Sequence, residues 1–417
     1  MDKKINLKRM LEDLENLRQF GRTPQGGVSR QPFAGPDKLA REYLLKQAAQ
    51  YGLQGRVDAL SNIIIGYKGK SQEKKTLILA SHYDSEINGG AYDGILGVVS
   101  GLEILRVLAE NTIELKYPIE LVAFNDEEGS RFGTGFSGSK AFTGLLTQDD
   151  LDNSIDAKGI SLAQAMEKAG FDPQAYKDAI RNKEEILGYL ELHIEQGPVL
   201  ENLSKEIGIV TGIVGSCRYS IRVTGRADHA GTTPMNMRLD PLQPCAKLWA
   251  ELPALAKIED DDAVATVGSI VTKPGASNVV ANSIEFTLDV RSLEKSGASK
   301  TSQLILQKLK EYCGIDYNVE IKNLKTLQQE EPTPMSYEII STIEAAAQEL
   351  EASYHFMGSG AGHDAELFAD LCPTGMIFVP SKDGRSHSPL EYTKPEHIEK
   401  GAQVMMATVL KLLQKLN

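Results

Sequence analysis

Four segments of the sequence place histidine or acidic side chains at or soon after the end of a short apolar run. They are His82 and Asp93 after residues 76–80, Glu127 and Glu128 after 119–124, His193 at the end of 188–193, and His387 after 374–380. Open α/β proteins build their sites in loops at the carboxyl ends of strands. Imidazoles and carboxylates without thiolates suit zinc, manganese, cobalt or nickel. The pattern therefore predicts a metal-dependent hydrolytic site.

The number of these side chains is sufficient for two metal ions. A dinuclear site needs a shared carboxylate and about two further ligands for each ion. Asp93 could be shared, with His82, His193, Glu128 and His387 as the further ligands. Adjacent carboxylates at a strand end, such as Glu127 and Glu128, can have separate roles: one binds a metal and its neighbour takes a proton from water.

Composition limits the classes of protein to consider. A chain of 417 residues exceeds one ordinary core, so two domains are expected. The net charge of −12 argues against a nucleic-acid partner, and no apolar stretch is long enough for a membrane span. Residues 1–21 indicate an amphipathic helix rather than a signal peptide. The four cysteines are far apart and form no CxxC pair, which favours a reducing cytoplasm over a disulfide framework.

Residues 1–212 and 328–417 alternate apolar strands with helical patterns. This alternation predicts an α/β catalytic domain with a mostly parallel sheet and helices on both faces. The expected strands are 76–80, 119–124, 188–193 and 374–380, and the expected helices are 94–110 and 395–416.

Residues 213–327 follow a different pattern, with strands that alternate polar and apolar residues. Strands are expected at 219–224, 264–271, 283–291 and 317–321, and helices at 239–255 and 299–312. The order strand, helix, strand, strand, helix, strand predicts a ferredoxin-like βαββαβ domain inserted into the first.

Six motifs together resemble the hydantoinase/carbamoylase branch of the metal-dependent aminoacylase-like amidohydrolases. They are SHYDSEINGGAYDG, NDEEGSRF, ELHIEQGPVLE, DHAGTTPM, SGAGHDAELFA and SHSPLE. The resemblance covers nearly the whole chain. It implies hydrolysis of the ureido C–N bond of a small carboxylate substrate, with release of ammonia and carbon dioxide.

The resemblance also implies a role for each site residue. Asp93 would bridge two divalent ions, zinc or manganese, with cobalt and nickel as further candidates. His82 and His193 would hold one ion, and Glu128 and His387 the other, with Glu127 as general base. The inserted domain would be a lid and homodimerisation module. Its residues His229, for the oxyanion, and Asn278 and Arg291, for the substrate, would complete the site together with Gln196 and His363.

The substrate and two rival functions stay open. N-carbamoyl-L-amino acids, allantoate (an intermediate of purine breakdown) and β-ureido acids share the ureido group and a carboxylate. Arg218 matches an arginine of allantoate-type members, which leans the choice toward allantoate. A metallo-exopeptidase of the same superfamily and a non-catalytic binding protein on this scaffold are the alternatives. A peptidase usually has a carboxylate where this chain has His193.

Overall fold

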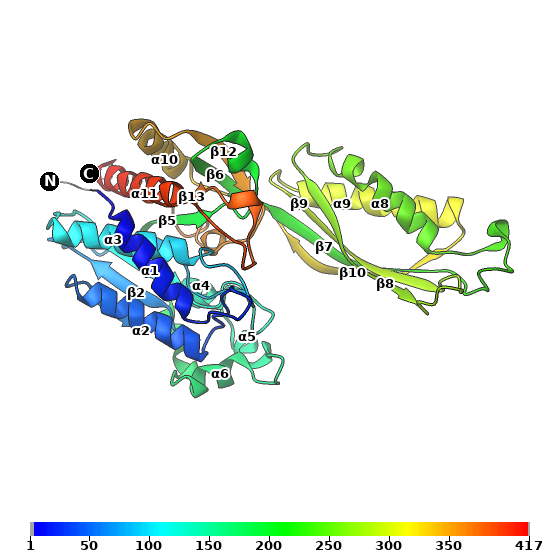
Figure 1. The fold of residues 1–417 in the computed structure, drawn as a ribbon, viewed down its shortest axis with the longest axis horizontal. Coiled ribbons are helices and arrows are strands. Elements are labelled where there is room, and N and C mark those ends of the chain that lie inside the picture. Colours follow the sequence, from blue (N-terminus) through cyan, green and yellow to red (C-terminus); the bar gives the residue numbers. More distant parts are fainter. Residues whose placement is uncertain (1–3, 416–417) are drawn as a thin grey trace. The chain divides into compact units, whose positions relative to one another are not determined.

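The computed structural model describes residues 4–415, which divide into two compact units (Figure 1). Unit 1 comprises Met1–Thr211 and Met335–Asn417, and unit 2 comprises Gly212–Pro334. Residues 1–3 and 416–417, which include the first residues of the expected N-terminal helix and the last of the expected C-terminal helix, lie outside the described residues.

Unit 1 is built on a nine-stranded sheet with the order β1-β2-β4-β3-β5-β13-β6-β11, in which β12 also pairs with β6. The four central strands β4, β3, β5 and β13 are parallel, as the sequence predicts, whereas the flanking pairs β1–β2, β2–β4, β13–β6 and β6–β11 are antiparallel. The strands of this sheet are β1 (Gln54–Val57), β2 (Ile63–Tyr67), β3 (Thr76–His82), β4 (Ile119–Phe124), β5 (Ile186–Ile194), β6 (Ile207–Ile213), β11 (Thr333–Pro334), β12 (Tyr354–Ser359) and β13 (Thr374–Val379).

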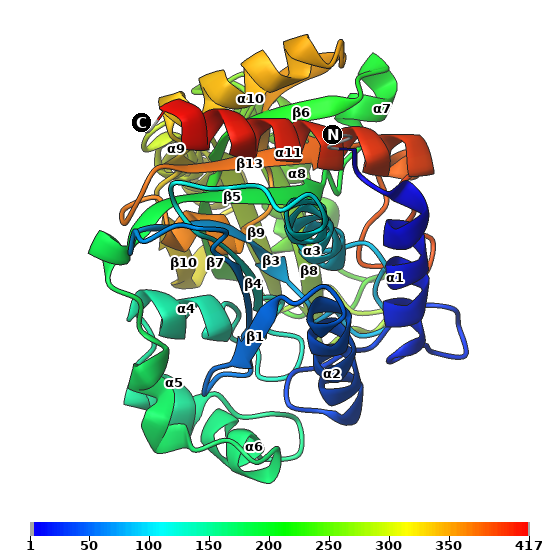
Figure 2. The same ribbon diagram turned by 90° about the vertical axis from the view of Figure 1, so that its left-hand side faces the viewer.

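Helices cover both faces of the sheet (Figure 2). On one face, α3 packs so closely that a Cβ at Gly97 would lie 2.3 Å from the Leu192 carbonyl oxygen, and α10 and α11 lie on the same core. On the other, Phe124 packs against Phe142 of α4 and against Phe368, and Tyr189 stacks on Phe368. The helices of unit 1 are α1 (Leu7–Gln19), α2 (Gly35–Ala49), α3 (Ile95–Glu110), α4 (Ser137–Thr143), α5 (Gln148–Asn153), α6 (Leu162–Lys168), α7 (Val199–Leu203), α10 (Tyr337–Glu349) and α11 (Pro395–Lys415), with 3₁₀ turns η1 (Pro173–Ala179), η2 (Lys183–Glu185), η5 (Asp364–Leu367) and η6 (Lys382–Gly384).

Unit 2 runs in the order β7, α8, β8, β9, α9, β10, and its antiparallel sheet has the strand order β10-β7-β9-β8. Alternate residues of β9 are buried, because one face of the sheet packs against α8 and α9 while the other face is polar. The elements are β7 (Gly215–Thr224), η3 (Met235–Met237), α8 (Leu242–Ala256), β8 (Val264–Lys273), β9 (Ser283–Ser292), α9 (Gly297–Glu311), the π-helical turn η4 (Tyr312–Asp316) and β10 (Glu320–Glu330).

The second boundary between the units differs from the expected one. The chain was expected to return to the catalytic domain at residue 328, but β10 continues to Glu330 and unit 2 ends at Pro334. Most residues of β10 are exposed, so the strand carries no clear apolar alternation that would reveal its length.

Two further features bear on the expected cellular context. None of the helices among residues 4–415 is long and apolar enough to cross a membrane. Cys217, Cys245, Cys313 and Cys372 are buried free thiols.

Candidate metal centre

Asp93 lies at the start of α3, immediately before a glycine that the local geometry requires. Gly94 has a φ of 66°, and a Cβ there would lie 2.4 Å from the His82 ring. Glycine therefore allows the imidazole from the end of β3 to approach the first turn of α3. The positive end of the α3 dipole also favours a carboxylate at this position.

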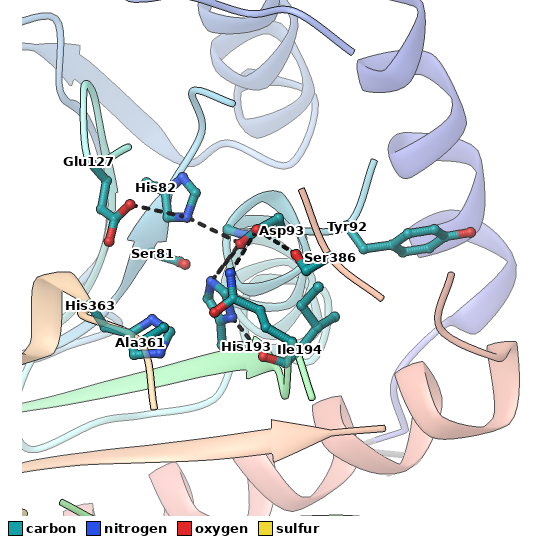
Figure 3. A network of polar contacts seen from close by, with 12 residues as sticks. Ser81, His82, Tyr92, Asp93, Glu127, His193, Ile194, Ala361, His363 and Ser386 are labelled. Carbon is teal, nitrogen blue, oxygen red and sulfur yellow. Dashed lines mark hydrogen bonds and ion pairs between the residues drawn. The ribbon is translucent and has the colours of Figure 1, made fainter. Parts of the chain in front are cut away.

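The two carboxylate oxygens of Asp93 face different histidines, of which His82 and His193 are drawn in Figure 3. Oδ1 lies 3.1 Å from Nε2 of His193 and 3.6 Å from Nε2 of His82. Oδ2 lies 3.1 Å from Nε2 of His387, which in turn lies 3.5 Å from Oε2 of Glu128. The five side chains expected to bind metal thus converge as two sets that share Asp93.

The hydrogen bonds of His193 direct its Nε2 lone pair toward Asp93. Nδ1 of His193 lies 2.8 Å from the Ile194 carbonyl oxygen, so this nitrogen carries the proton of the neutral ring. Nε2 then holds a lone pair, which accepts from the Gly94 N–H at 3.2 Å. That lone pair faces the buried Oδ1 of Asp93 at 3.1 Å, and Oδ1 has no hydrogen-bond donor. Two facing lone pairs at this distance need a positive charge between them, from a metal ion or a proton.

The electrostatics of the centre favour positive charge. Burial alone would raise the pKa of the Asp93 carboxyl, but His193, His387 and His82 hold it well below its usual range. The hydrogen bond from His387 to Asp93 raises the pKa of His387 to about 9. Glu128 adds to this increase, and partial burial opposes it. A carboxylate that stays ionised in a buried site is a suitable bridging ligand.

Glu127 lies at the edge of this centre rather than in either set. Its carboxylate is 8% exposed, and Oε2 lies 3.9 Å from Nε2 of His82 (Figure 3). Burial raises the pKa of Glu127 well above its usual range; nearby Glu128 and Asp364 add to the shift, while His82 opposes it. A raised pKa is what a carboxylate needs to act as a general base near neutral pH.

Asp84 belongs to the centre but is absent from the sequence analysis. Its Oδ1 lies 3.4 Å from Nδ1 of His82 and accepts the Glu127 N–H at 3.1 Å, while Oδ2 accepts the Glu128 N–H at 3.3 Å. Asp84 therefore orients a candidate ligand and holds the turn that carries the two glutamates. The spacing His-X-Asp in SHYD was the signal that could have revealed it.

Three further polar residues near the centre were also missed. The Ser386 hydroxyl lies 2.9 Å from Oδ2 of Asp93 and 2.7 Å from Oε2 of Glu391. Glu391 accepts the backbone N–H groups of Tyr92 and Asp93, which fixes the loop before α3. Glu86 brings a carboxylate oxygen within 4.8 Å of the ligand atoms of Glu128 and His387. All three lie within the motifs SHYDSEINGGAYDG and SHSPLE, but residue type alone did not distinguish them from solvated polar residues.

Gln196 and His363, expected as substrate contacts, lie in the same centre. Nε2 of Gln196 donates to Oδ2 of Asp93 at 2.8 Å and lies 3.1 Å from Nε2 of His387. The His363 ring packs edge-on against His193 at 4.6 Å, and its Nε2 lies 2.8 Å from the Ser359 hydroxyl. Burial and then His193 lower the pKa of His363 well below its usual range, so the ring is neutral.

His229 and Asn278 come together in unit 2. The Ala230 N–H donates to the Asn278 carbonyl oxygen at 3.0 Å, and His229 forms a bridge with Val279. His229 is exposed, and its Nδ1 accepts hydrogen bonds from the loop that follows it. These backbone contacts therefore hold together the two loops that carry His229 and Asn278.

Arg218 and Arg291 share one carboxylate on the polar face of the unit 2 sheet. Arg218 pairs with Asp289 across β7 and β9, and donates to Oδ2 of Asp289 through Nε at 3.1 Å and Nη2 at 2.9 Å. Arg291 donates to the same side chain at 3.2 and 3.1 Å. The two guanidinium groups therefore lie side by side against Asp289, and guanidinium groups are suited to bind a carboxylate or a polar ureido arm.

Fold and centre together define a two-unit hydrolase with a candidate metal-binding site at the carboxyl ends of parallel strands. The model of the family described as Peptidase family M20/M25/M40 matches residues 72–411. The match spans most of the chain, so the protein belongs to this family.

Its similarity to individual proteins extends over the full length. The chain is 37% identical to the N-carbamoyl-L-amino acid amidohydrolase of Geobacillus stearothermophilus, covering 98% of this chain and 99% of the relative. It is 34% identical to the allantoate amidohydrolase of Escherichia coli, covering 96% and 97%. The crystal structure of a hydantoinase/carbamoylase family amidase from Burkholderia multivorans superposes with a TM-score of 0.92 at 31% identity, over 99% of each chain. The expected resemblance is confirmed, and the chain is a hydrolase.

Proposed function

We propose that this protein is a dinuclear metal-dependent amidohydrolase that cleaves the ureido C–N bond of a small carboxylate substrate. The observation that carries the proposal is the division of Asp93, whose Oδ1 faces His82 and His193 and whose Oδ2 faces His387. Asp93 would bridge two ions, with Glu128 completing the second set. Such ions supply Lewis-acid activation of water and of the scissile carbonyl.

The chain's own residues supply proton transfer and positioning. Glu127, with its raised pKa, takes the proton of the attacking water and returns it to the leaving nitrogen. His229 donates a hydrogen bond to the developing oxyanion, where charge makes a donor most effective. The expected products are ammonia, carbon dioxide and the freed amino compound.

The substrate carboxylate is assigned to the arginines of unit 2. Arg291 binds it through charge-assisted hydrogen bonds and Asn278 adds a polar contact. Arg218, held beside Arg291 by Asp289, suits a second ureido arm and so favours allantoate over simple N-carbamoyl-L-amino acids. Relatives named for both substrates match this chain at similar identity, so the preference for allantoate rests on Arg218.

Two rival functions make different use of the same residues. A metallo-exopeptidase of this family would usually have a carboxylate in place of His193. A non-catalytic protein on this scaffold would be expected to lack the base or a ligand, whereas this chain keeps Glu127 and all five candidate ligands at the centre.

The test is ammonia release from a panel of substrates after reconstitution with manganese, zinc, cobalt or nickel. The panel contains allantoate, N-carbamoyl-L-amino acids, a β-ureido acid and a set of dipeptides. The proposal expects metal-dependent ammonia release from ureido acids and no dipeptide cleavage. Dipeptide hydrolysis without ammonia release establishes the peptidase instead, and inactivity toward the whole panel favours the binding protein.

Unit 2 is proposed as a ferredoxin-like lid and as the homodimer interface. Its edge strand β8 leaves Val264, Ile270 and Val271 about half exposed, an unusual surface for a strand that stays unpaired. Pairing of β8 with its twin in a second copy would cover these side chains. The four buried thiols suit a reducing cytoplasm.

In such a dimer we expect His229 to act in the partner's site. Two inactive proteins, His229→Ala and Glu127→Gln, are mixed and allowed to exchange subunits. Action in trans restores activity, because one site in each mixed dimer combines an intact Glu127 with an intact His229. If differently tagged subunits exchange and the mixture stays inactive, His229 acts within its own chain.

A further inference from the structure

We infer that the turn at residues 229–233 presets His229 as a hydrogen-bond donor through Nε2, and that Gly231, Thr232 and Arg238 position it. The turn follows β7 in unit 2, and the inference concerns contacts within that unit alone. The tautomer of His229 follows from the geometry of the turn. Its role as hydrogen-bond donor to an oxyanion rests on the proposed function.

Two backbone donors point at one nitrogen of the ring. The Gly231 N–H donates to Nδ1 of His229 at 3.1 Å and the Thr232 N–H donates to the same atom at 3.2 Å. A nitrogen that accepts two hydrogen bonds cannot also carry a proton directed at those donors. In the neutral ring the proton therefore lies on Nε2, because the tautomer is set by the bonds of the other nitrogen.

The turn that supplies these donors is closed at several points. The Thr233 N–H donates to the His229 carbonyl oxygen at 3.2 Å. Arg238 joins the two ends of the turn, donating to the carbonyl oxygens of Ala230 at 2.6 Å and Thr233 at 3.0 Å. The Ala230 N–H is held by Asn278 at 3.0 Å. The donors to Nδ1 thus sit on a backbone fixed from both sides.

Glycine at position 231 suits the close approach of the ring. A Cβ built there would lie 3.3 Å from Cε1 of His229, which is tighter than usual, and 3.5 Å from Nδ1, which is an ordinary contact. An alanine would therefore displace the imidazole slightly from the two N–H groups. Gly231 therefore acts by leaving room for the ring as well as by its backbone donor.

The consequence for catalysis is that the oxyanion donor needs no reorganisation during the reaction. A free neutral imidazole exchanges between two tautomers and several side-chain rotamers. Here Nδ1 is anchored to the backbone and Nε2 faces away from the anchor, with its N–H in a fixed direction. Donors fixed in advance are the ones that stabilise developing charge most strongly.

The test is the ring ¹⁵N spectrum of the full-length protein labelled at histidine, recorded without substrate at pH 8.5, about two units above the ordinary imidazole pKa. The His229 signals are assigned by their loss in His229→Gln. The native protein should show an unprotonated Nδ1 and a protonated Nε2, with no averaging. An Nδ1–H form, or the averaged pattern of free histidine, overturns the inference. Because no turnover is involved, this result is independent of the proposed reaction.

Variants then test the positioning residues. Gly231→Ala, Thr232→Pro and Arg238→Met should each shift the His229 Nδ1 signal and lower kcat about 3–10-fold with little change in KM, since each weakens about one hydrogen bond. Arg238→Lys, which can still reach one carbonyl, should fall between Arg238→Met and the native protein. The matched control is Arg226→Met, because Arg226 lies in the same loop but bonds Asp228 and Met237 rather than the turn.

Circular dichroism and metal content confirm that each variant is folded before it is scored. Folded Gly231→Ala and Arg238→Met proteins that keep the native His229 spectrum and native kcat contradict the positioning role. An altered spectrum with native kcat contradicts the link to the oxyanion. If the native protein releases no ammonia from any ureido acid, the proposed function fails while the spectral result stands.

Discussion

The metal centre of unit 1 and the arginine pair of unit 2 hold their polar groups in opposite ways. In unit 1, His82, Asp93 and His193 are at most 5% exposed, and the Asp93 Oδ1 and His193 Nε2 lone pairs face each other. In unit 2, Arg218 and Arg291 lie on an open sheet face and are satisfied by Asp289. The first arrangement gathers buried acceptor atoms around one carboxylate, and the second gathers two guanidinium groups around one carboxylate.

This difference indicates how each region depends on its ligand. Buried lone pairs that face each other are costly unless a cation lies between them, so the candidate centre of unit 1 is suited to a metal ion. The arginines of unit 2 already bond Asp289, and in the proposed function the substrate carboxylate would be an additional partner. Changes at the metal centre should therefore abolish activity, whereas changes in the arginine pair should alter it by degrees.

Removal of the bridge should have the largest effect. Asp93→Ala takes away the carboxylate that both ligand sets share, so we expect loss of both metals and of all activity. Glu86→Gln is the matched comparison, because Glu86 is the other carboxylate near Glu128 and His387. We expect this variant to retain both ions. If metal analysis finds that Asp93→Ala keeps both ions and Glu86→Gln loses them, Glu86 rather than Asp93 is the bridging ligand.

Removal of the base should separate metal binding from turnover. Glu127 lies 3.9 Å from His82 but in neither ligand set, so Glu127→Gln should keep its metal. Loss of a general base lowers kcat by about 10²–10⁴-fold. Metal content and kcat measured on the same preparation check this expectation. If the Glu127→Gln protein loses its metal, Glu127 is a metal ligand rather than only the base.

Changes in the arginine pair should be smaller and dependent on the substrate. Arg291→Ala removes charge-assisted hydrogen bonds to the carboxylate, at a cost of about 1.5–3 kcal/mol, and should raise KM for every ureido acid about tenfold to a hundredfold. Arg218→Leu should raise KM for allantoate more than KM for N-carbamoyl-L-amino acids. Equal KM changes for the two substrates in Arg218→Leu would remove the preference for allantoate.

The sequence predicts the parts of the fold whose apolar residues are periodic. The run 119–124 is β4 in full, and α11 begins at Pro395 as expected, because both elements are buried against the core. The polar strand β10 and the short antiparallel strands at both edges of the unit 1 sheet were missed or underestimated. The edge strands β1 and β11 bury little surface, so burial leaves little pattern in their sequence, whereas β2 and β6 carry buried apolar runs that could have revealed them.

The candidate site shows the same limit. Ligands placed at strand ends were predictable, because parallel strands bring their carboxyl ends to one edge of the sheet. Ser386 and Glu391 contact Asp93 through folding of a loop almost 300 residues away, which no local spacing reveals. Asp289 was overlooked because its role depends on the register that sets it opposite Arg218.

The number of metal ions bound by each chain tests the central claim most directly. After reconstitution and removal of free metal, elemental analysis should find two ions in the native protein and about one in His387→Ala, since that change leaves His82, His193 and Oδ1 of Asp93 in place. A native protein saturated by one ion, or a His387→Ala protein with an unchanged count, would contradict the division of Asp93 between two metals.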